Sequence, residues 1–191
     1  MNKSKQQLAI QQDSNGEPED KMVADAKQTP QAFAAIYDRY VSQIYHYLLS
    51  HVGNSAEAQD MTSQVFLSAL DRFSAYQHRG HFAAWLFTIA RHKWMDYFRH
   101  DHRELPLEAM VNLPSKDDPH LETLNLEEIQ MIRRAVCELP EDDQELIRLR
   151  FVARLNFAEI ALILGCKEEA AKKRLYRLLA RLENEMEVRN G

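Results

Sequence analysis

Apolar side chains recur at steps of three and four residues along most of this chain, a spacing that favours α-helix over any other regular structure. The clearest run begins at Phe33 and stops before Gly53. Its apolar members are Phe33, Ile36, Tyr37, Tyr40, Val41, Ile44, Tyr45, Leu48 and Leu49. Only 5 of the 191 residues are glycine, so few positions favour a break in the helices. We therefore expect an all-α protein.

Two further helices are expected in the first half of the chain. Asn54 followed by Glu57 has the spacing of a helix-capping box, and an apolar stripe continues from there to Phe73. A polar loop over residues 74–81 then precedes a helix from about Phe82 to His100. These helices predict a first domain over residues 22–101, with residues 1–21 as a polar, mobile tail.

The second half is predicted to be a separate helical domain over residues 122–191. A proline-interrupted segment, 102–121, lacks any sustained period and is expected to be a flexible, acidic linker. In the second domain one helix stops at Pro140 and another runs from Glu141 to about Val152. A second capping signature at Asn156, a turn at Gly165 and a last helix from about Glu168 predict a helix-turn-helix.

Charge is distributed unevenly along the chain, whose net charge is -5. Residues 71–103 carry a net +3 and residues 148–191 a net +4, whereas residues 104–147 between them carry -9. Two basic segments on either side of an acidic one indicate two surfaces that bind nucleic acid and a spacer that avoids it.

The last helix carries a row of cations opposite an apolar seam. Ala171, Leu175, Leu178 and Leu182 fall on one side by helical spacing. The far side holds Lys173, Arg177 and Arg181 at successive steps of four, with Arg174 beside them. Together with Lys172 these are the candidate DNA contacts, and we call the five residues the basic stripe. A helix of this kind after a glycine turn fits the major groove of duplex DNA, where Lys and Arg bind phosphates and guanine edges. The alternative is a solvated charged face with no ligand.

A second candidate nucleic-acid surface is predicted from the 74–81 loop and the helix that follows it. Basic residues interleaved with aromatic ones suit single-stranded DNA, because unpaired bases stack on rings while cations follow the phosphates. Trp85 and Tyr97 are expected in the core by their angular position. The candidate contacts are Tyr76, Arg79, Arg91, His92 and Arg99.

Other functional classes find little support in the sequence. Histidines gather between residues 78 and 102 but lack the spacing of a metal site, and no nucleophile, phosphate-binding or dinucleotide motif is present. No apolar run reaches the length of a membrane span, and the N-terminal residues do not read as a signal peptide. We expect a cytoplasmic protein that is not an enzyme and needs no metal or cofactor.

Two groups of short stretches resemble a known family, the extracytoplasmic-function (ECF) sigma factors of bacterial RNA polymerase. Residues 58–67 and 84–91, with Asp96 and Arg99 after them, resemble region 2 of that family. Residues 139–141, 149–151, 157–161 and 172–177 resemble its region 4. The two groups occur in the family's order and together span about Phe33 to Glu183.

The resemblance implies partners and roles. It implies binding to core RNA polymerase, through the β′ clamp and the β subunit, with Asp60, Gln64 and Phe66 as docking residues. It implies that the loop and third helix capture the melted -10 element of promoter DNA, and that the last helix reads the -35 element as duplex. An anti-sigma factor, soluble or at the inner membrane face, would hold the protein inactive. Transcription initiation would then be the function.

Two other functions remain open at this stage. A helix-turn-helix regulator that senses a ligand with its first domain would share the DNA-binding half, and a scaffold without DNA contact would share only the helices. For the linker, we expect Glu104, Glu108, Asp117 and Asp118 to line a basic nucleic-acid channel of the polymerase, with a merely soluble spacer as the alternative.

Overall fold

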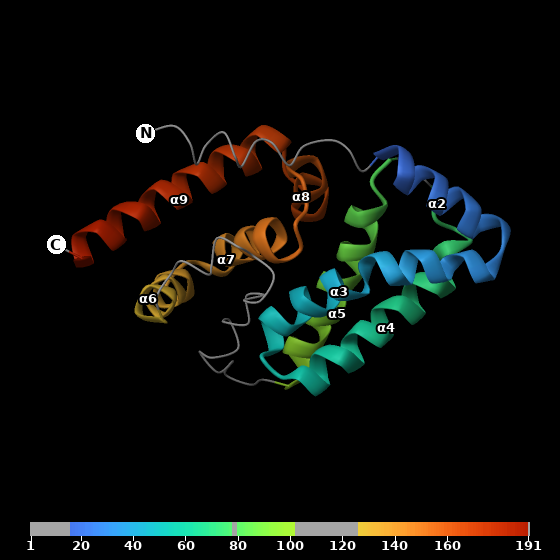
Figure 1. The fold of residues 1–191 in the computed structure, drawn as a ribbon, viewed down its shortest axis with the longest axis horizontal. Helices are drawn as coiled ribbons and strands as arrows, with labels where there is room; N and C mark the ends of the chain where they lie inside the picture. Colours follow the sequence, from blue (N-terminus) through green and yellow to red (C-terminus); the bar gives the residue numbers. More distant parts are fainter. Residues whose placement is uncertain (1–15, 78–79, 102–125, 191) are drawn as a thin grey trace.

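The structure is a computed structural model that describes residues 16–77, 80–101 and 126–190. Every regular element within these ranges is helical, which confirms the all-α prediction (Figure 1). Some predicted residues lie outside the described ranges, namely Arg79, Glu104, Glu108, Asp117 and Asp118.

The first half is a helical bundle built around one long central helix. Its elements are α2 (Gly16–Gln28), the short 3-10 turn η1 (Pro30–Ala32), α3 (Phe33–Val52), α4 (Ser55–Phe73) and α5 (Phe82–Asp101). Helix α3 packs against both α4 and α5. The fully buried side chains Ile36, Ile44 and Leu48 lie on its apolar face, as the spacing predicted.

The turn between α3 and α4 follows from two residues. Gly53 adopts a φ of 66°, the left-handed region that glycine enters without strain, and donates its N–H to the Leu49 carbonyl at 2.9 Å. The Asn54 side chain then accepts from the N–H groups of Ala56 and Glu57 at 2.8 and 3.2 Å. The predicted helix end and the predicted asparagine cap are therefore both confirmed.

Helix α2 was not predicted. Its residues 16–21 were assigned to the tail and residues 22–28 to the first domain, in both cases without a helix. Glu19 is only 5% exposed and accepts hydrogen bonds from the Tyr40 hydroxyl and from the N–H of Phe82, the first residue of α5. Burial and the Glu19 carboxylate raise the pKa of Tyr40. A polar side chain in a polar segment thus ties α2 to the bundle.

The second half consists of α6 (Leu126–Cys137), α7 (Glu141–Ile147), η3 (Arg148–Val152), α8 (Phe157–Leu164) and α9 (Glu168–Asn190). The predicted helix 141–152 is present, but its last part, η3, is π-helical. Within η3 the Arg150 side chain is buried, donates to the Leu155 carbonyl at 2.8 Å and lies 4.9 Å from the Phe157 ring centroid. These contacts join η3 to the start of α8.

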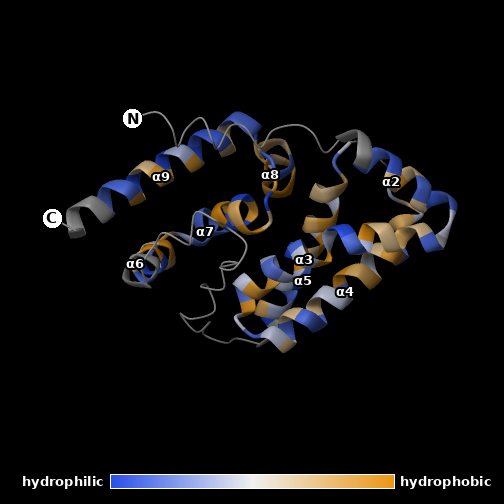
Figure 2. Cartoon of the chain, in the orientation of Figure 1, coloured by the Kyte–Doolittle hydropathy of each residue, from blue (hydrophilic) through white to orange (hydrophobic). Residues whose placement is uncertain are grey.

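Helices α8 and α9 form the predicted helix-turn-helix. Asn156 and Glu159 complete a capping box, with Asn156 Oδ1 accepting from Glu159 N–H at 2.9 Å and Glu159 Oε2 accepting from Asn156 N–H at 2.8 Å. Gly165 ends α8 with a φ of 66°. Figure 2 shows that α8 is mostly hydrophobic, whereas α9 contains both hydrophobic and hydrophilic residues.

The capping box supports a stability prediction. Replacing Asn156 with alanine should lower the free energy of unfolding by about 1 kcal/mol, because the first turn of α8 loses its side-chain acceptor. Urea unfolding followed by circular dichroism measures this change. Gln59→Ala, at an exposed position of α4, is the control and should leave the midpoint unchanged. An equal loss in both variants would show that the cap contributes nothing specific.

Candidate nucleic-acid interface

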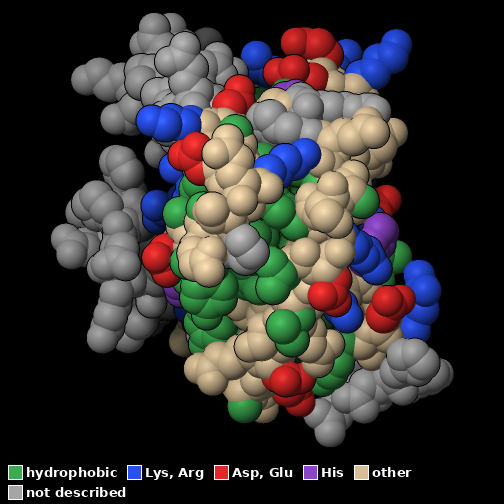
Figure 3. Space-filling view, turned by 90° about the vertical axis from the view of Figure 1, so that its right-hand side faces the viewer, with side chains coloured by type: hydrophobic (Ala, Val, Ile, Leu, Met, Phe, Trp, Pro, Cys, Tyr) green, Lys and Arg blue, Asp and Glu red, His purple; other side chains and the backbone are tan. Residues whose placement is uncertain are grey.

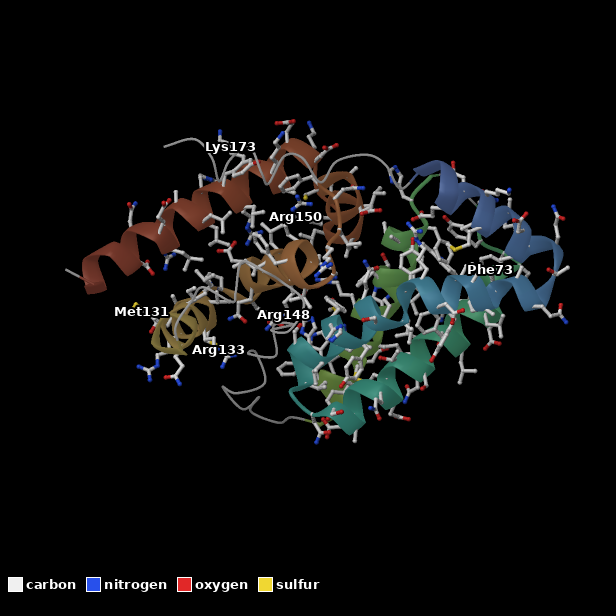
Figure 4. The ribbon with its side chains drawn as sticks, in the orientation of Figure 1. Phe73, Met131, Arg133, Arg148, Arg150 and Lys173 are labelled. Atoms are coloured by element: carbon white, nitrogen blue, oxygen red, sulfur yellow. The ribbon has the colours of Figure 1, made fainter. Side chains whose placement is uncertain are left out.

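The basic stripe lies outside the buried seam of α9, and its members point in more than one direction. The seam residues Ala171, Leu175, Leu178 and Leu182 are all less than 10% exposed. Lys173, Arg177 and Arg181 are exposed, and Lys172 and Arg174 are partly exposed. Figure 4 shows Lys173 on the side of α9 that faces away from α7. The helix therefore buries one side and offers cations on the other.

Two arginines of the basic stripe already have acidic partners. Arg174 Nε lies 2.6 Å from Asp143 Oδ1, and its Nη2 lies 4.0 Å from Asp142 Oδ2, so this side chain is directed toward α7. Arg181 pairs with Glu185 one turn further along α9, at 2.8 Å. Lys172, Lys173 and Arg177 make no ion pair with any residue that the structure describes. They are the members of the stripe best placed for DNA.

The first-half surface is smaller than predicted, because Tyr76 is not on it. The Tyr76 ring is 8% exposed and packs against Phe82 and Trp85, with ring centroids 5.3 and 4.6 Å away. The Tyr76 N–H bonds to the Phe73 carbonyl at 3.1 Å and continues the turn at the end of α4, which directs the ring inward. The prediction of an exposed ring was wrong, since the polar neighbours concealed a core residue.

The other described members of this surface lie along α5. His92 is exposed, and Arg99 is 68% exposed with Asp96 at 3.5 Å. Arg91 is 28% exposed and lies 3.5 Å from a carboxylate of the second half. Phe98, which was not among the predicted contacts, is 43% exposed beside Arg99 and offers the aromatic ring that Tyr76 does not. Trp85 and Tyr97 pack against the core, as predicted.

The predicted docking residues on α4 divide between surface and core. Asp60 and Gln64 are exposed and joined by a hydrogen bond of 2.8 Å from Gln64 Nε2 to Asp60 Oδ2. Phe66 is 5% exposed, with the Tyr37 ring 4.8 Å away. Phe66 is therefore not an exposed docking residue in this structure. It belongs to the apolar face of α4, which packs on α3.

Two leucines complete the exposed side of α4. Leu67 is 63% exposed and Leu70 is 46% exposed. By helical spacing they share a side with Asp60 and Gln64, and we call these four residues the α4 face. Figure 3 views the molecule from the end that carries α2 and shows hydrophobic side chains gathered on the surface among charged ones. Leu67 could have been recognised from the sequence, because it falls outside the apolar stripe.

A hollow of about 460 Å³ adjoins the α4 face. Its lining residues come from α4 and α5 and are Glu57, Asp60, Met61, Gln64, Lys93, Asp96 and Tyr97. Both helices contribute acidic groups, α4 adds the amide of Gln64 and α5 adds Lys93, so the lining has a mixed polar character. Among the described residues no group of three or more His, Cys, Asp or Glu side chains is placed to hold a metal ion.

A buried charged cluster, absent from the sequence predictions, joins the two halves. Glu145 of α7 is 6% exposed; its Oε1 accepts from the Tyr47 hydroxyl at 2.7 Å, and its Oε2 lies 3.1 Å from His51 Nε2. His51 stacks on Trp94 with ring centroids 4.6 Å apart. In Figure 4, Arg148 lies between α7 and α3, close to this cluster. The spacing of residues along the chain gave no sign of it.

The cluster predicts acid sensitivity. Burial, followed by the Arg148 charge, lowers the pKa of His51 to about 4 from its usual 6.5, although Glu145 acts in the opposite direction. A depressed pKa means that the native state resists protonating His51, so its stability is complete above pH 6.5 and falls as the pH drops toward 4. The pKa of Glu145 is also lowered, so protonation of Glu145 destabilises the native state further at still lower pH.

We expect the free energy of unfolding to fall by about 2 kcal/mol between pH 7 and pH 5, with His51 as the cause. Urea unfolding at several pH values measures this. In His51→Gln the fall over that range should be much smaller, whereas His46→Gln, at a half-buried histidine of the same helix, should behave as the unaltered protein does. If His51→Gln keeps the full dependence, another group causes it.

Comparison with known proteins identifies both halves. Residues 36–104 match the family described as Sigma-70 region 2, and residues 129–182 match Sigma-70, region 4. The ECF RNA polymerase sigma factor BldN of Streptomyces coelicolor is 36% identical over 159 residues, which cover 79% of this chain and 59% of that relative. SigM of Bacillus subtilis, another ECF sigma factor, is 26% identical over 78% of this chain and 91% of its own length.

Solved structures share the fold. CnrH, in complex with the cytosolic domain of CnrY, aligns with a TM-score of 0.62 and 19% identity, over 87% of this chain and 96% of that one. RpoE of Bartonella quintana, in complex with the anti-sigma factor NepR, aligns with a TM-score of 0.60 and 21% identity, over 82% and 97%. No helix among the described residues could span a membrane. With a region 2 bundle followed by a region 4 helix-turn-helix, this chain belongs to the ECF sigma factors.

Proposed function

We propose that this protein binds core RNA polymerase and directs it to promoters, with region 2 holding the melted -10 element and region 4 reading the duplex -35 element. The observation that carries the proposal is the pairing, in one chain, of an exposed docking surface with a DNA-binding helix. The α4 face offers two exposed leucines beside Asp60 and Gln64, and α9 presents Lys173 and Arg177 opposite its buried seam.

The residue roles follow from exposure and charge. Lys172, Lys173 and Arg177 are proposed to contact the -35 duplex directly, whereas Arg174 positions α9 through its ion pair with α7. On α5, His92, Phe98 and Arg99 are proposed to hold the melted strand, since an exposed ring beside cations suits unpaired bases. Arg79 stays a proposal from the sequence alone.

We propose that the α4 face binds the β′ clamp of the polymerase and that other surfaces of the protein contact the β subunit. Exposed apolar side chains with polar neighbours are the usual anchors of protein interfaces, which supports Leu67 and Leu70 as contacts. Phe66 supports the face from beneath. The nucleotide chemistry is assigned to the polymerase, so the chain itself is proposed to be no enzyme and to act in the cytoplasm.

An anti-sigma factor is the proposed regulator. The structures of CnrH and RpoE named above are of complexes with CnrY and NepR, and membership of the same family supports a comparable partner here. The acidic linker is proposed to lie in a basic channel of the polymerase, where its carboxylates would resemble a nucleic-acid backbone.

Binding to core polymerase tests the proposal against the two alternatives. The pure protein and core enzyme should elute as one complex in size-exclusion chromatography, and only that complex should retain a promoter fragment at physiological salt. A ligand-sensing regulator would retain the DNA without polymerase, and a scaffold would retain no DNA in either case. Either result would contradict the proposed function.

A further inference from the structure

A buried carboxylate of region 4 occupies a pocket that belongs to region 2. Glu145 comes from α7, whereas Tyr47 and His51 come from α3 and Arg91 from α5. Tyr47 Oη, His51 Nε2 and Arg91 Nε lie 2.7, 3.1 and 3.5 Å from the carboxylate oxygens. All three polar atoms of the pocket therefore lie within 3.5 Å of a carboxylate from the other half of the protein, and the Tyr47 hydroxyl donates a hydrogen bond to it.

The region 2 side of the pocket is held in place without Glu145. Tyr47 is fully buried and its ring packs edge-on against Phe87 at 5.4 Å. His51 is 3% exposed. Its ring lies edge-on to that tyrosine and stacks on Trp94, with ring centroids 4.8 and 4.6 Å away. The packing of these rings fixes the positions of the hydroxyl and the imidazole, so the pocket is preorganised to bind an acidic side chain.

The pocket favours the ionised carboxylate. Burial alone would raise the pKa of Glu145, but His51, the Tyr47 hydroxyl and Arg148 together hold it below its usual value. Arg148 is itself buried, bonds to Gln144 Oε1 at 3.1 Å and faces the cluster from the region 4 side, with Glu141 also near it. Because an ionised carboxylate loses its hydration when buried, it stays there only while these partners surround it.

Occupation of the pocket also engages Arg91, one of the side chains predicted to contact the melted strand. The same closed arrangement packs α8 of region 4 on α5 of region 2, and η3 on α3. Region 4 thus covers part of the helix whose outer residues are proposed to hold DNA. In this closed arrangement Arg91 is engaged by Glu145 and is not available to the melted promoter strand.

We propose that Tyr47, His51 and Arg91 form a carboxylate-binding site of region 2, that Glu145 of region 4 is its ligand, and that this contact holds the two regions closed in competition with melted promoter DNA. The competition rests on the function proposed above. The closure does not, since it concerns two parts of the same chain and needs neither DNA nor polymerase.

Closure is tested on the full chain alone. Glu145→Gln keeps the shape of the side chain but removes its charge, and Tyr47→Phe removes one donor while keeping the ring. Each should shift the equilibrium between closed and open forms toward the open form. The shift should be roughly a hundredfold for Glu145→Gln, which loses a buried ionic partner, and roughly tenfold for Tyr47→Phe, which loses one hydrogen bond to a charged group. Small-angle X-ray scattering should show a larger radius of gyration, and hydrogen exchange should become faster where α8 meets α5.

Asp142→Asn is the matched control, because Asp142 is a carboxylate on the same helix that is 79% exposed. It should leave both measurements unchanged. If Glu145→Gln and Tyr47→Phe both keep their circular dichroism spectra, radius of gyration and exchange rates, the carboxylate site does not hold the regions together. If Glu145→Gln loses helicity, Tyr47→Phe decides the question, since its packing is conserved.

The competition is tested separately with a single-stranded oligonucleotide that carries the -10 sequence, added together with core polymerase. Glu145→Gln should bind it several-fold more tightly than the unaltered protein, and Asp142→Asn should not. If the variants open but bind the strand no more tightly, closure stands and the competition with DNA is overturned. If the unaltered protein binds no polymerase, the proposed function fails while the scattering result still decides closure.

Discussion

Replacing Lys173 and Arg177 together with alanine is expected to remove most of the affinity for promoter duplex and to leave binding to core polymerase unchanged. Both side chains are exposed on α9 and make no ion pair with a described residue, so their charges are available to phosphates. Each lost contact should lower the slope of log affinity against log salt by about one and cost roughly tenfold in affinity. Fluorescence anisotropy at several salt concentrations measures both.

A second double variant provides the control for charge. Lys21→Ala with Arg39→Ala changes the net charge equally, at exposed positions of α2 and α3. It should leave the salt slope unaltered. Should the two pairs weaken DNA binding alike, net charge and not the position of the basic stripe would account for the effect. A parallel loss of polymerase binding in the α9 variant would contradict the separation of the two surfaces.

Replacing Gln64 and Leu67 with alanine should have the opposite pattern, weakening core polymerase binding by about tenfold or more. Leu67 is 63% exposed and contributes little to the core, so its truncation removes contact area without unfolding the bundle. Titration of labelled protein with core enzyme measures the dissociation constant. At core enzyme concentrations high enough to saturate the variant, the complex should bind promoter duplex as the unaltered complex does.

Here the matched control is Leu162→Ala with Gln31→Ala. Leu162 is 57% exposed on α8, so the pair removes a comparable leucine and glutamine from elsewhere on the surface. Normal polymerase binding in this control and weak binding in the α4 variant would locate the docking surface. Equal losses would indicate that exposed leucines contribute non-specifically, and the α4 face would lose its assignment.

The elements that the sequence predicted are those determined by local chemistry. Helix α3 ends at Gly53 because glycine enters the left-handed region without strain, and α8 begins at Asn156 because its side chain satisfies an N–H group of the first turn. The buried seam of α9 was predicted in the same way, because its apolar residues recur at steps of four and three along the helix. Signals of this kind lie within a few residues of the feature that they specify.

The structure departs from the sequence predictions where distant segments make contact. Tyr76 was assigned to a surface because its neighbours are polar, yet Phe82 and Trp85 cover its ring. Arg174 belongs by spacing to the basic stripe, but Asp143 on another helix binds it. Spacing along one helix identifies which side chains share a side. Which partner covers that side depends on the packing of other helices, which the spacing does not contain.

Glu19 and Glu145 illustrate the same limit for charged residues. Each lies in a polar stretch of sequence, where a glutamate is normally solvated, and each is buried against tyrosine hydroxyls of α3. Their burial follows from the partners that α3 and α5 provide, residues far away in the chain. The sequence therefore predicted the helices of both halves except α2, but not the way in which the halves are joined.

The central claim, that this protein directs polymerase to defined promoters through both of its regions, is tested most directly by mapping RNA 5′ ends. Core polymerase with the pure protein should initiate at discrete sites on fragmented genomic DNA, and those sites should share two sequence elements at a fixed spacing. The Lys173→Ala, Arg177→Ala variant should lose these starts while still binding the core enzyme. The claim would be contradicted if the starts were scattered, as they are with core polymerase alone. It would also be contradicted if this variant kept the discrete starts at full strength.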